Sequence, residues 1–130
     1  MLSRVANSIY WMNRYIERVE NYARFMSVNF NLTLDLPPDI NAQWEPLLIA
    51  TADEYFYYQY HEKATQEDVI SFMTFDKRNP NSIVSCLYMA RENARTIRET
   101  ISKEMWESIN TFYLNVKAMS ADQFKNMDHM

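Results

Sequence analysis

The chain contains no glycine in its 130 residues, and this absence restricts the available folds and sites more than any other feature. Phosphate-binding loops, Rossmann fingerprints and nucleophile elbows all need glycine where the backbone turns sharply or approaches a ligand. Tight β-hairpins also favour glycine, so a hairpin-rich β fold is disfavoured. We therefore expect an all-α protein that lacks these nucleotide-binding and hydrolytic sites.

The N-terminal segment predicts a long amphipathic helix over about residues 3–33. Its apolar residues recur at alternating spacings of four and three, which places them on one side of an α-helix. Aromatic residues occupy a further face, so this helix should contact neighbours on at least two sides. The apolar seam is Val5, Ile9, Met12, Ile16, Val19, Ala23, Met26 and Phe30, and the further face carries Trp11, Tyr15, Tyr22 and Phe25.

Prolines separate the first helix from a second one. The pair Pro37-Pro38 must lie beyond the end of the first helix, and Pro46 suits the first turn of a helix over about residues 44–60. The aromatic run Tyr55–Tyr60 closes this second segment. We interpret the run as core residues with half-buried tyrosines, and a docking surface for a partner is the alternative.

Two more helices follow, each beginning at a residue that can cap free backbone N–H groups. Thr65 is the expected N-cap of one, and either Asn81 or Ser82 is the expected N-cap of the other. The apolar seam of the last helix contains an extra step of four, which predicts a bend or break near residues 100–103. The expected helices cover about residues 3–33, 44–60, 66–75 and 82–119.

The last helical segment repeats the amphipathic pattern of the first. Two such helices bury their apolar seams best by packing against each other. We therefore expect one domain over residues 1–130, an all-α bundle of about four helices with the long N-terminal helix antiparallel to the long C-terminal helix. The second seam is Ile83, Leu87, Ala90, Ala94, Ile97, Ile101, Met105, Ile109, Phe112, Val116 and Met119.

Charged residues follow both seams by one position. Arg91, Arg95 and Arg98 share one helix face and should repel one another. The equivalent edge of the first helix carries Glu17 and Glu20, and equivalent edges meet in an antiparallel pair. Our hypothesis is that these two glutamates form ion pairs with one or more of the three arginines.

The polar residues along these edges form one candidate site with two interpretations. They could be a network of salt bridges and hydrogen bonds that fixes the register of the helices. Alternatively, because arginine binds carboxylate and phosphate through two parallel hydrogen bonds, they could hold a nucleotide, a phosphate or a peptide C-terminus. We assign no catalytic residue, since no carboxylate pair has clearly different surroundings. The candidate residues are Arg14, Glu17, Arg18, Glu20, Asn21, Arg24, Arg91, Glu92, Asn93, Arg95 and Arg98.

Several ligands and locations are disfavoured by residue counts. The two histidines, His61 and His129, do not follow a glutamate by three residues as in di-metal bundles, so we expect no metal and no cofactor. Residues 32–82 carry nine Asp or Glu against three Lys or Arg, which disfavours nucleic-acid binding. No apolar run reaches the roughly 18 residues that a membrane span needs. The single cysteine, Cys86, suits a reducing cytoplasm, where we expect the protein.

Short motifs at both ends of the chain resemble those of the bacterial Alpha-E family, a helical domain named for a Glu-Arg motif. The resemblance is close over residues 1–31 and 76–114 and looser between them. Family members are usually longer, so we expect a truncated or short member. The matching residues are Met1-Leu2-Ser3-Arg4-Val5-Ala6, Tyr10-Trp11-Met12, Arg14-Tyr15, Glu17-Arg18, Glu20-Asn21, Ala23-Arg24, Asn79-Pro80, Ser82-Ile83, Ala90-Arg91-Glu92-Asn93-Ala94-Arg95, Arg98-Glu99 and Met105-Trp106-Glu107.

The resemblance implies a partner more than a reaction, because the family has no established biochemical activity. Its genes are associated with circularly permuted ATP-grasp proteins and transglutaminase-like proteins, which implies a peptide-ligation or peptide-modification system. We therefore expect a non-enzymatic helical interaction or scaffold module with a protein partner of one of these two types. The alternative is an anion-binding or catalytic component that uses the polar cluster. Self-association is a further alternative if truncation uncovers apolar surface.

Overall fold

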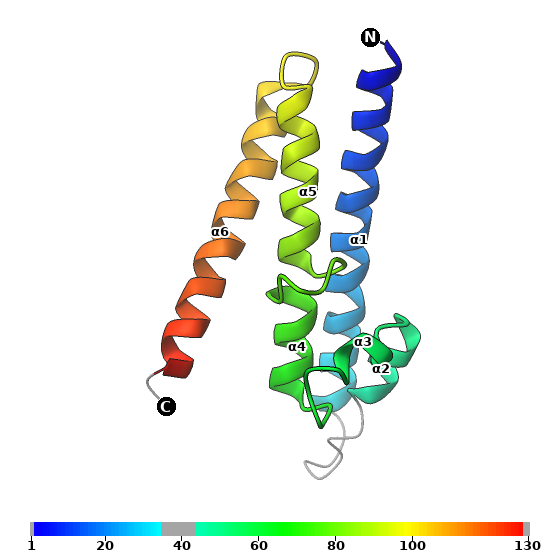
Figure 1. The fold of residues 1–130 in the computed structure, drawn as a ribbon, viewed down its shortest axis with the longest axis vertical. Coiled ribbons are helices and arrows are strands. Elements are labelled where there is room, and N and C mark those ends of the chain that lie inside the picture. Colours follow the sequence, from blue (N-terminus) through cyan, green and yellow to red (C-terminus); the bar gives the residue numbers. More distant parts are fainter. Residues whose placement is uncertain (1, 35–43, 129–130) are drawn as a thin grey trace.

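The computed structural model describes residues 2–34 and 44–128, and the side chains of most of them up to Ser120. These residues form six α-helices and no strand, so the all-α prediction is confirmed (Figure 1). The helices are α1 (Leu2–Leu34), α2 (Glu45–Ala50), α3 (Glu54–Tyr57), α4 (Gln66–Thr74), α5 (Ile83–Thr96) and α6 (Lys103–Asp128).

Three long helices, α1, α5 and α6, make up most of the molecule. In Figure 1, α1 runs from top to bottom, α5 returns upward beside it, and α6 runs down again on the other side of α5. The contacts of α5 with both α1 and α6 agree with this view. The predicted antiparallel packing of the N-terminal helix is therefore confirmed for α5, whereas α6 runs in the same direction as α1. The short helices α2, α3 and α4 pack around the lower part of α1 and α5 (Figure 1).

The C-terminal segment is a helical hairpin rather than one long helix over residues 82–119. Helix α5 ends at Thr96, and a turn over residues 97–102 reverses the chain before α6 begins at Lys103. Ser102 starts α6, because its hydroxyl accepts a hydrogen bond from the backbone N–H of Met105 at 3.1 Å. The seam irregularity thus marks a reversal, and α6 extends past residue 119 to Asp128.

The predicted helix over residues 44–60 is divided into α2 and α3. Ala52 lies between them with a φ of 60°, in the left-handed region that stops an α-helix. The aromatic residues that follow have different environments. Tyr57 is fully buried and donates a hydrogen bond to the carbonyl of Lys63 at 2.5 Å, whereas Tyr55 is 80% exposed. The run of aromatics therefore contributes to the core at Tyr57 and to the surface at Tyr55.

The predicted helix starts agree with the structure at three positions. The Thr65 hydroxyl accepts a hydrogen bond from the Asp68 N–H, and the Ser82 hydroxyl accepts one from the Ser85 N–H, both at 3.2 Å. Ser82, rather than Asn81, is therefore the N-cap of α5. Pro46 occupies the first turn of α2.

The core consists of two groups of buried side chains. The larger joins all six helices or their flanking turns, and Cys86 packs in it as a small apolar group. The smaller joins α1, α5 and α6 through Met12, Ala90, Ala94 and Ile109. The largest fully buried side chains of the first group are Trp44, Tyr57, Phe72, Leu48 and Met73.

Part of the predicted apolar seam remains open to solvent. On α1 the seam residue Phe30 is 41% exposed, whereas Tyr22, assigned to the further face, is buried. On α6 the seam residues Met105, Phe112 and Met119 are all about half exposed. The exposed seam of α6 is therefore apolar surface that the described helices leave uncovered. Separately, no described helix has the length and apolar character needed to cross a membrane.

Candidate functional site

The candidate residues on α1 lie at its surface. Arg14 donates a hydrogen bond to the Glu17 carboxylate at 3.4 Å, one turn away on the same helix. Arg18 is half buried, and its guanidinium lies 5.4 Å from the ring centre of Tyr15. The remaining members are exposed and form no side-chain hydrogen bond or ion pair with described residues: Glu20, Asn21 and Arg24.

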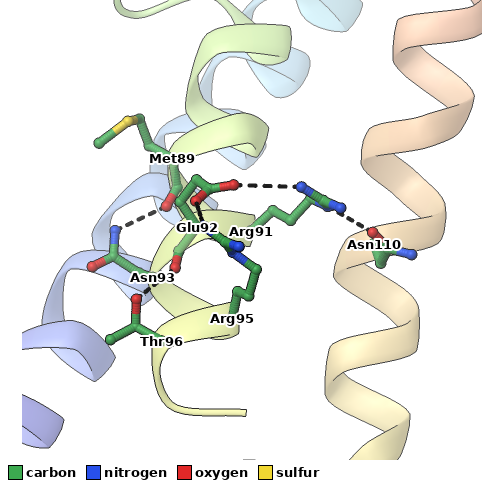
Figure 2. Close-up of polar contacts among 7 residues, drawn as sticks. All are labelled: Met89, Arg91, Glu92, Asn93, Arg95, Thr96 and Asn110. Atoms are coloured by element: carbon green, nitrogen blue, oxygen red, sulfur yellow. Dashed lines mark hydrogen bonds and ion pairs between the residues drawn. The ribbon is translucent and has the colours of Figure 1, made fainter.

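The candidate residues on α5 are joined mainly to one another. Glu92 accepts hydrogen bonds from Arg95 at 2.7 Å and from Arg91 at 3.4 Å, so one carboxylate serves two guanidinium groups (Figure 2). Asn93 donates to the backbone carbonyl of Met89 at 2.8 Å. This group of bonds fixes side chains along one helix and reaches its neighbour only through Arg91.

Arg91 connects α5 to α6. Its Nε donates a hydrogen bond to the Asn110 side-chain oxygen at 2.6 Å, as Figure 2 shows. Its guanidinium also lies 5.8 Å from the ring centre of Trp106 and 5.4 Å from that of Tyr113. Arg98 lies 5.0 Å from the Trp106 ring centre. Arg91 and Arg98 therefore lie against aromatic rings of α6, and Arg91 also binds an amide side chain of that helix.

The predicted ion pairs between α1 and α5 are wrong. Five ion pairs within 4.0 Å occur among the described side chains, and each joins residues no more than four positions apart in the sequence. None joins Glu17 or Glu20 to Arg91, Arg95 or Arg98. The reason is the hairpin: α6 folds back on α5 and offers Trp106, Asn110 and Tyr113 to the arginine stripe. The α1 and α5 groups therefore exchange no described hydrogen bond and do not form the shared cluster of the hypothesis.

A buried polar contact that the sequence did not indicate holds α1 to the turn before α3. Tyr22 donates a hydrogen bond to the carboxylate of Asp53, and both residues are almost fully buried. Burial raises the pKa of Tyr22, and the bond to Asp53 and its negative charge raise it further, so Tyr22 remains a donor. Nearby, Asn79 donates to the Phe72 carbonyl at 3.3 Å.

An open groove of about 480 Å³ lies between α1 and α6. We call it the acidic groove, because its two charged lining residues, Glu20 on α1 and Glu104 on α6, are both acids. A shallower hollow next to it on α6 adds Glu107. The apolar residues that line the groove are Ile16, Val19, Leu87, Met105, Ile109 and Phe112.

A second hollow, of about 510 Å³, opens on a different face of α5. We call it the tyrosine pocket. Two cations line it, and no acid is among its described lining residues. Of the predicted site residues, Arg18 alone lines this pocket. The lining residues are Tyr15, Arg18, Lys77, Pro80, Val84, Ser85, Tyr88, Met89 and Tyr113.

Sequence reasoning missed most of the residues that line the tyrosine pocket, whereas the apolar lining of the acidic groove comes from the two predicted seams. Lys77, Tyr88 and Tyr113 come from three segments, and nothing in their local sequence links them. A signal was available for the contacts of Arg91, because Trp106, Asn110 and Tyr113 follow one another at spacings of four and three on one face of α6. Among the described residues, no group of three His, Cys, Asp or Glu side chains is placed to hold a metal ion.

Comparison with known families identifies the chain. A sequence model of the Alpha-E family, described as a predicted alpha-helical domain with a conserved ER motif, matches residues 1–130. The chain belongs to the Alpha-E family. No curated protein and no solved structure matches it. The one Glu-Arg dipeptide of this Alpha-E chain is Glu17-Arg18, and its two side chains diverge, since Glu17 binds Arg14 while Arg18 lines the tyrosine pocket.

Proposed function

We propose that this Alpha-E chain is a non-enzymatic helical interaction module whose acidic groove receives a basic amphipathic helix of a protein partner. The partner is an ATP-grasp or transglutaminase-like protein of a peptide-ligation or peptide-modification system in the cytoplasm. The observation that carries the docking proposal is the exposed apolar seam of α6 between acidic residues. The identity of the partner rests on the expectation for the family.

The apolar lining of the groove favours a helical occupant. Met105 and Phe112 lie two turns apart on α6 and are 43% and 50% exposed. Ile16 and Val19 form the facing wall on α1, and both are partly or fully buried. A helix whose apolar residues recur every three or four positions can place them between these walls, as in other helix-in-groove complexes. Burial of the exposed parts of Met105 and Phe112 would supply hydrophobic free energy.

The charges beside the groove favour a basic partner. Glu20 lies on one wall and Glu104 on the other, and neither forms an ion pair with a described side chain. Glu107 lies in the adjoining hollow with Lys103 at 3.9 Å. Lys or Arg residues at the edges of an apolar helix face would therefore meet acids on both sides. Such complementarity sets orientation and speeds association.

The same charges disfavour a second copy of the chain as the occupant. In a two-fold dimer through this groove, each copy would present the same patch to the other. Glu20 and Glu104 of one copy would then approach Glu20 and Glu104 of the other. Like charges brought together at an interface oppose binding. A partner with the opposite charge is the better fit.

Co-expression with each type of partner tests the proposal. The chain is produced together with an ATP-grasp protein, and separately with a transglutaminase-like protein, from the same genome. Light scattering coupled to gel filtration measures the mass of any complex, and calorimetry measures its Kd. We expect a complex with one of the two enzymes. The variant with Met105→Gln and Phe112→Gln should bind about tenfold more weakly or worse, since both apolar contacts are lost.

The matched control is Leu114→Gln on the same helix. Leu114 is 48% exposed, like Phe112, but does not line the groove, so its replacement should leave Kd unchanged. The absence of a complex with either enzyme would contradict the choice of partner. Equal binding by the groove variant and the wild type would contradict the role of the groove. Concentration-dependent dimerisation of the chain alone, abolished by the groove variant, would assign the groove to a second copy instead.

A further inference from the structure

We propose that the tyrosine pocket binds a small anionic ring compound, with a phosphate or carboxylate held by Arg18 and Lys77 and a planar ring held against the tyrosines. This site goes beyond the docking function, because different residues of α5 line the two hollows. Leu87 lines the acidic groove, whereas Val84 and Tyr88 line the pocket. The two sites can therefore be tested separately.

The pocket has an excess of positive charge. Arg18 and Lys77 line it, and neither forms an ion pair within 4.0 Å with any described side chain. Two further cations lie near its wall, because Arg91 and Lys117 are 5.4 Å and 6.0 Å from the ring centre of Tyr113. Arg91 is already paired with Glu92, so the donors left without a described carboxylate partner for a bound anion are those of Arg18 and Lys77. Arg18 can offer two parallel hydrogen bonds to such a group.

The walls of the pocket are suited to a flat ring. Tyr15, Tyr88 and Tyr113 come from α1, α5 and α6, and the ring centres of Tyr88 and Tyr113 are 5.9 Å apart with an angle of 52° between the planes. Met89, which is 38% exposed, adds a polarisable thioether beside them. Aromatic rings and methionine sulfur both pack favourably against a planar ligand ring.

The size of the pocket fits a small molecule. Its volume of about 510 Å³ lies within the usual range for small-ligand sites. The three tyrosines are positioned by the packed helices α1, α5 and α6. The anionic group could come from a nucleotide or from the C-terminus of an aromatic peptide, and both share the chemistry of a ring with an attached anion.

Two matched pairs of probes test the site by calorimetry on the full chain. AMP is compared with adenosine, and N-acetyltyrosine is compared with N-acetyltyrosine amide, so that each pair differs only in its anionic group. We expect at least one anionic probe to bind about tenfold more tightly than its uncharged counterpart. Added salt should weaken that binding. Inorganic phosphate alone should bind more weakly than the tighter anionic probe, because it lacks the ring.

Substitutions locate the binding. Arg18→Met should weaken the anionic probe by about tenfold, whereas Arg14→Met on the same helix should leave it unchanged, since Arg14 lies outside the pocket. Tyr88→Leu should weaken both members of the binding pair, because it removes a ring from the wall. Binding of AMP alone identifies the anion as a phosphate, and binding of N-acetyltyrosine alone identifies it as a carboxylate. Failure of both probes to bind, or equal losses for Arg14→Met and Arg18→Met, would overturn the proposal.

Discussion

The hydroxyl of Tyr22 on α1 donates a hydrogen bond to the buried carboxylate of Asp53, in the turn before α3. The two residues are 31 positions apart, and their contact holds the short helices α2 and α3 against the long helix. Tyr22→Phe should lower the free energy of unfolding by about 2 kcal/mol, because a buried carboxylate loses its hydrogen-bond donor. Urea denaturation measures the loss.

Tyr10→Phe is the matched control for this bond. Tyr10 lies on the same helix but is 55% exposed, so the loss of its hydroxyl should change stability little. In an Asp53→Asn background, the additional cost of Tyr22→Phe should also fall, because an uncharged amide is less costly to leave unpaired. Equal costs for Tyr22→Phe in the two backgrounds would contradict an interaction between these residues.

Arg91 should contribute more to stability than the neighbouring arginines. Arg91→Ala removes the 2.6 Å hydrogen bond to Asn110 and the contacts with two rings of α6, so we expect a loss of about 1–2 kcal/mol. Arg95→Ala should cost less than about 0.5 kcal/mol, because the Arg95 side chain is 65% exposed and bonds only within α5. Thermal unfolding of the two variants measures the difference, and similar losses would contradict the bridging role of Arg91.

The local sequence predicted the beginnings of helices better than their ends. Thr65, Ser82 and Pro46 each mark a helix start by a mechanism that operates within one turn, and each lies where predicted. The division at Ala52 had no such signal, because a glycine-free chain uses an ordinary residue in the left-handed region. The reversal at residues 97–102 was only partly visible in the sequence. The apolar seam continues through the turn at Ile101 and into α6 at Met105, so its extra step of four indicated a bend or break but not a reversal.

The candidate site was predicted less well than the fold because charge alone does not determine which side chains meet. The repulsion among Arg91, Arg95 and Arg98 indicated that a complementary surface was needed. An acidic edge was available on α1, but α6 folds back and places Trp106 and Tyr113 within 5.8 Å of the guanidinium groups of Arg91 or Arg98. Aromatic rings attract guanidinium groups as well, so the arginine pattern alone was compatible with either an acidic or an aromatic surface as its neighbour. Tertiary packing decided between them.

Alkaline pH should weaken the fold through Cys86. Burial raises the pKa of this thiol from 9.0 to about 11, and this effect outweighs the opposing effect of the Arg18 charge. Well below pH 9 the thiol is protonated in both the folded and the unfolded chain, and its contribution to stability is complete. As the pH rises from 9 towards 11, only the unfolded chain releases the proton, so stability falls by about 2 kcal/mol.

Denaturation in urea at several pH values between 8 and 10 measures this slope. Cys86→Ala should unfold more easily at every pH, because it removes a buried group, but its stability should depend less on pH. The comparison is made below pH 10 because burial also raises the pKa of Tyr22, which adds a similar dependence at higher pH. An identical slope for the variant and the wild type would show that Cys86 does not titrate as its burial requires.

Reversing charges beside the acidic groove should weaken binding of the proposed basic partner. The single variants Glu20→Lys and Glu104→Lys each place a cation on one wall of the groove. For each we expect a slower association rate and about tenfold weaker binding at low salt. The loss should shrink as salt rises, because these residues are exposed. Glu99→Lys changes the net charge equally in the exposed turn between α5 and α6 and is the control. Surface plasmon resonance measures both rates, and an equal effect of Glu99→Lys would indicate attraction to net charge alone.

Ala52→Gly should stabilise the protein. Ala52 has a φ of 60°, where the Cβ of an L-residue approaches the neighbouring carbonyl oxygen and costs about 1–2 kcal/mol. Glycine avoids this contact, although it gives the unfolded chain more conformational freedom, so the net gain should be about 0.5–1 kcal/mol. Ala23→Gly is the matched control, because Ala23 is exposed within α1 and the same change there should cost about 1 kcal/mol. Opposite signs for the two substitutions in urea denaturation would confirm backbone strain at Ala52, and a loss of stability in both would exclude it.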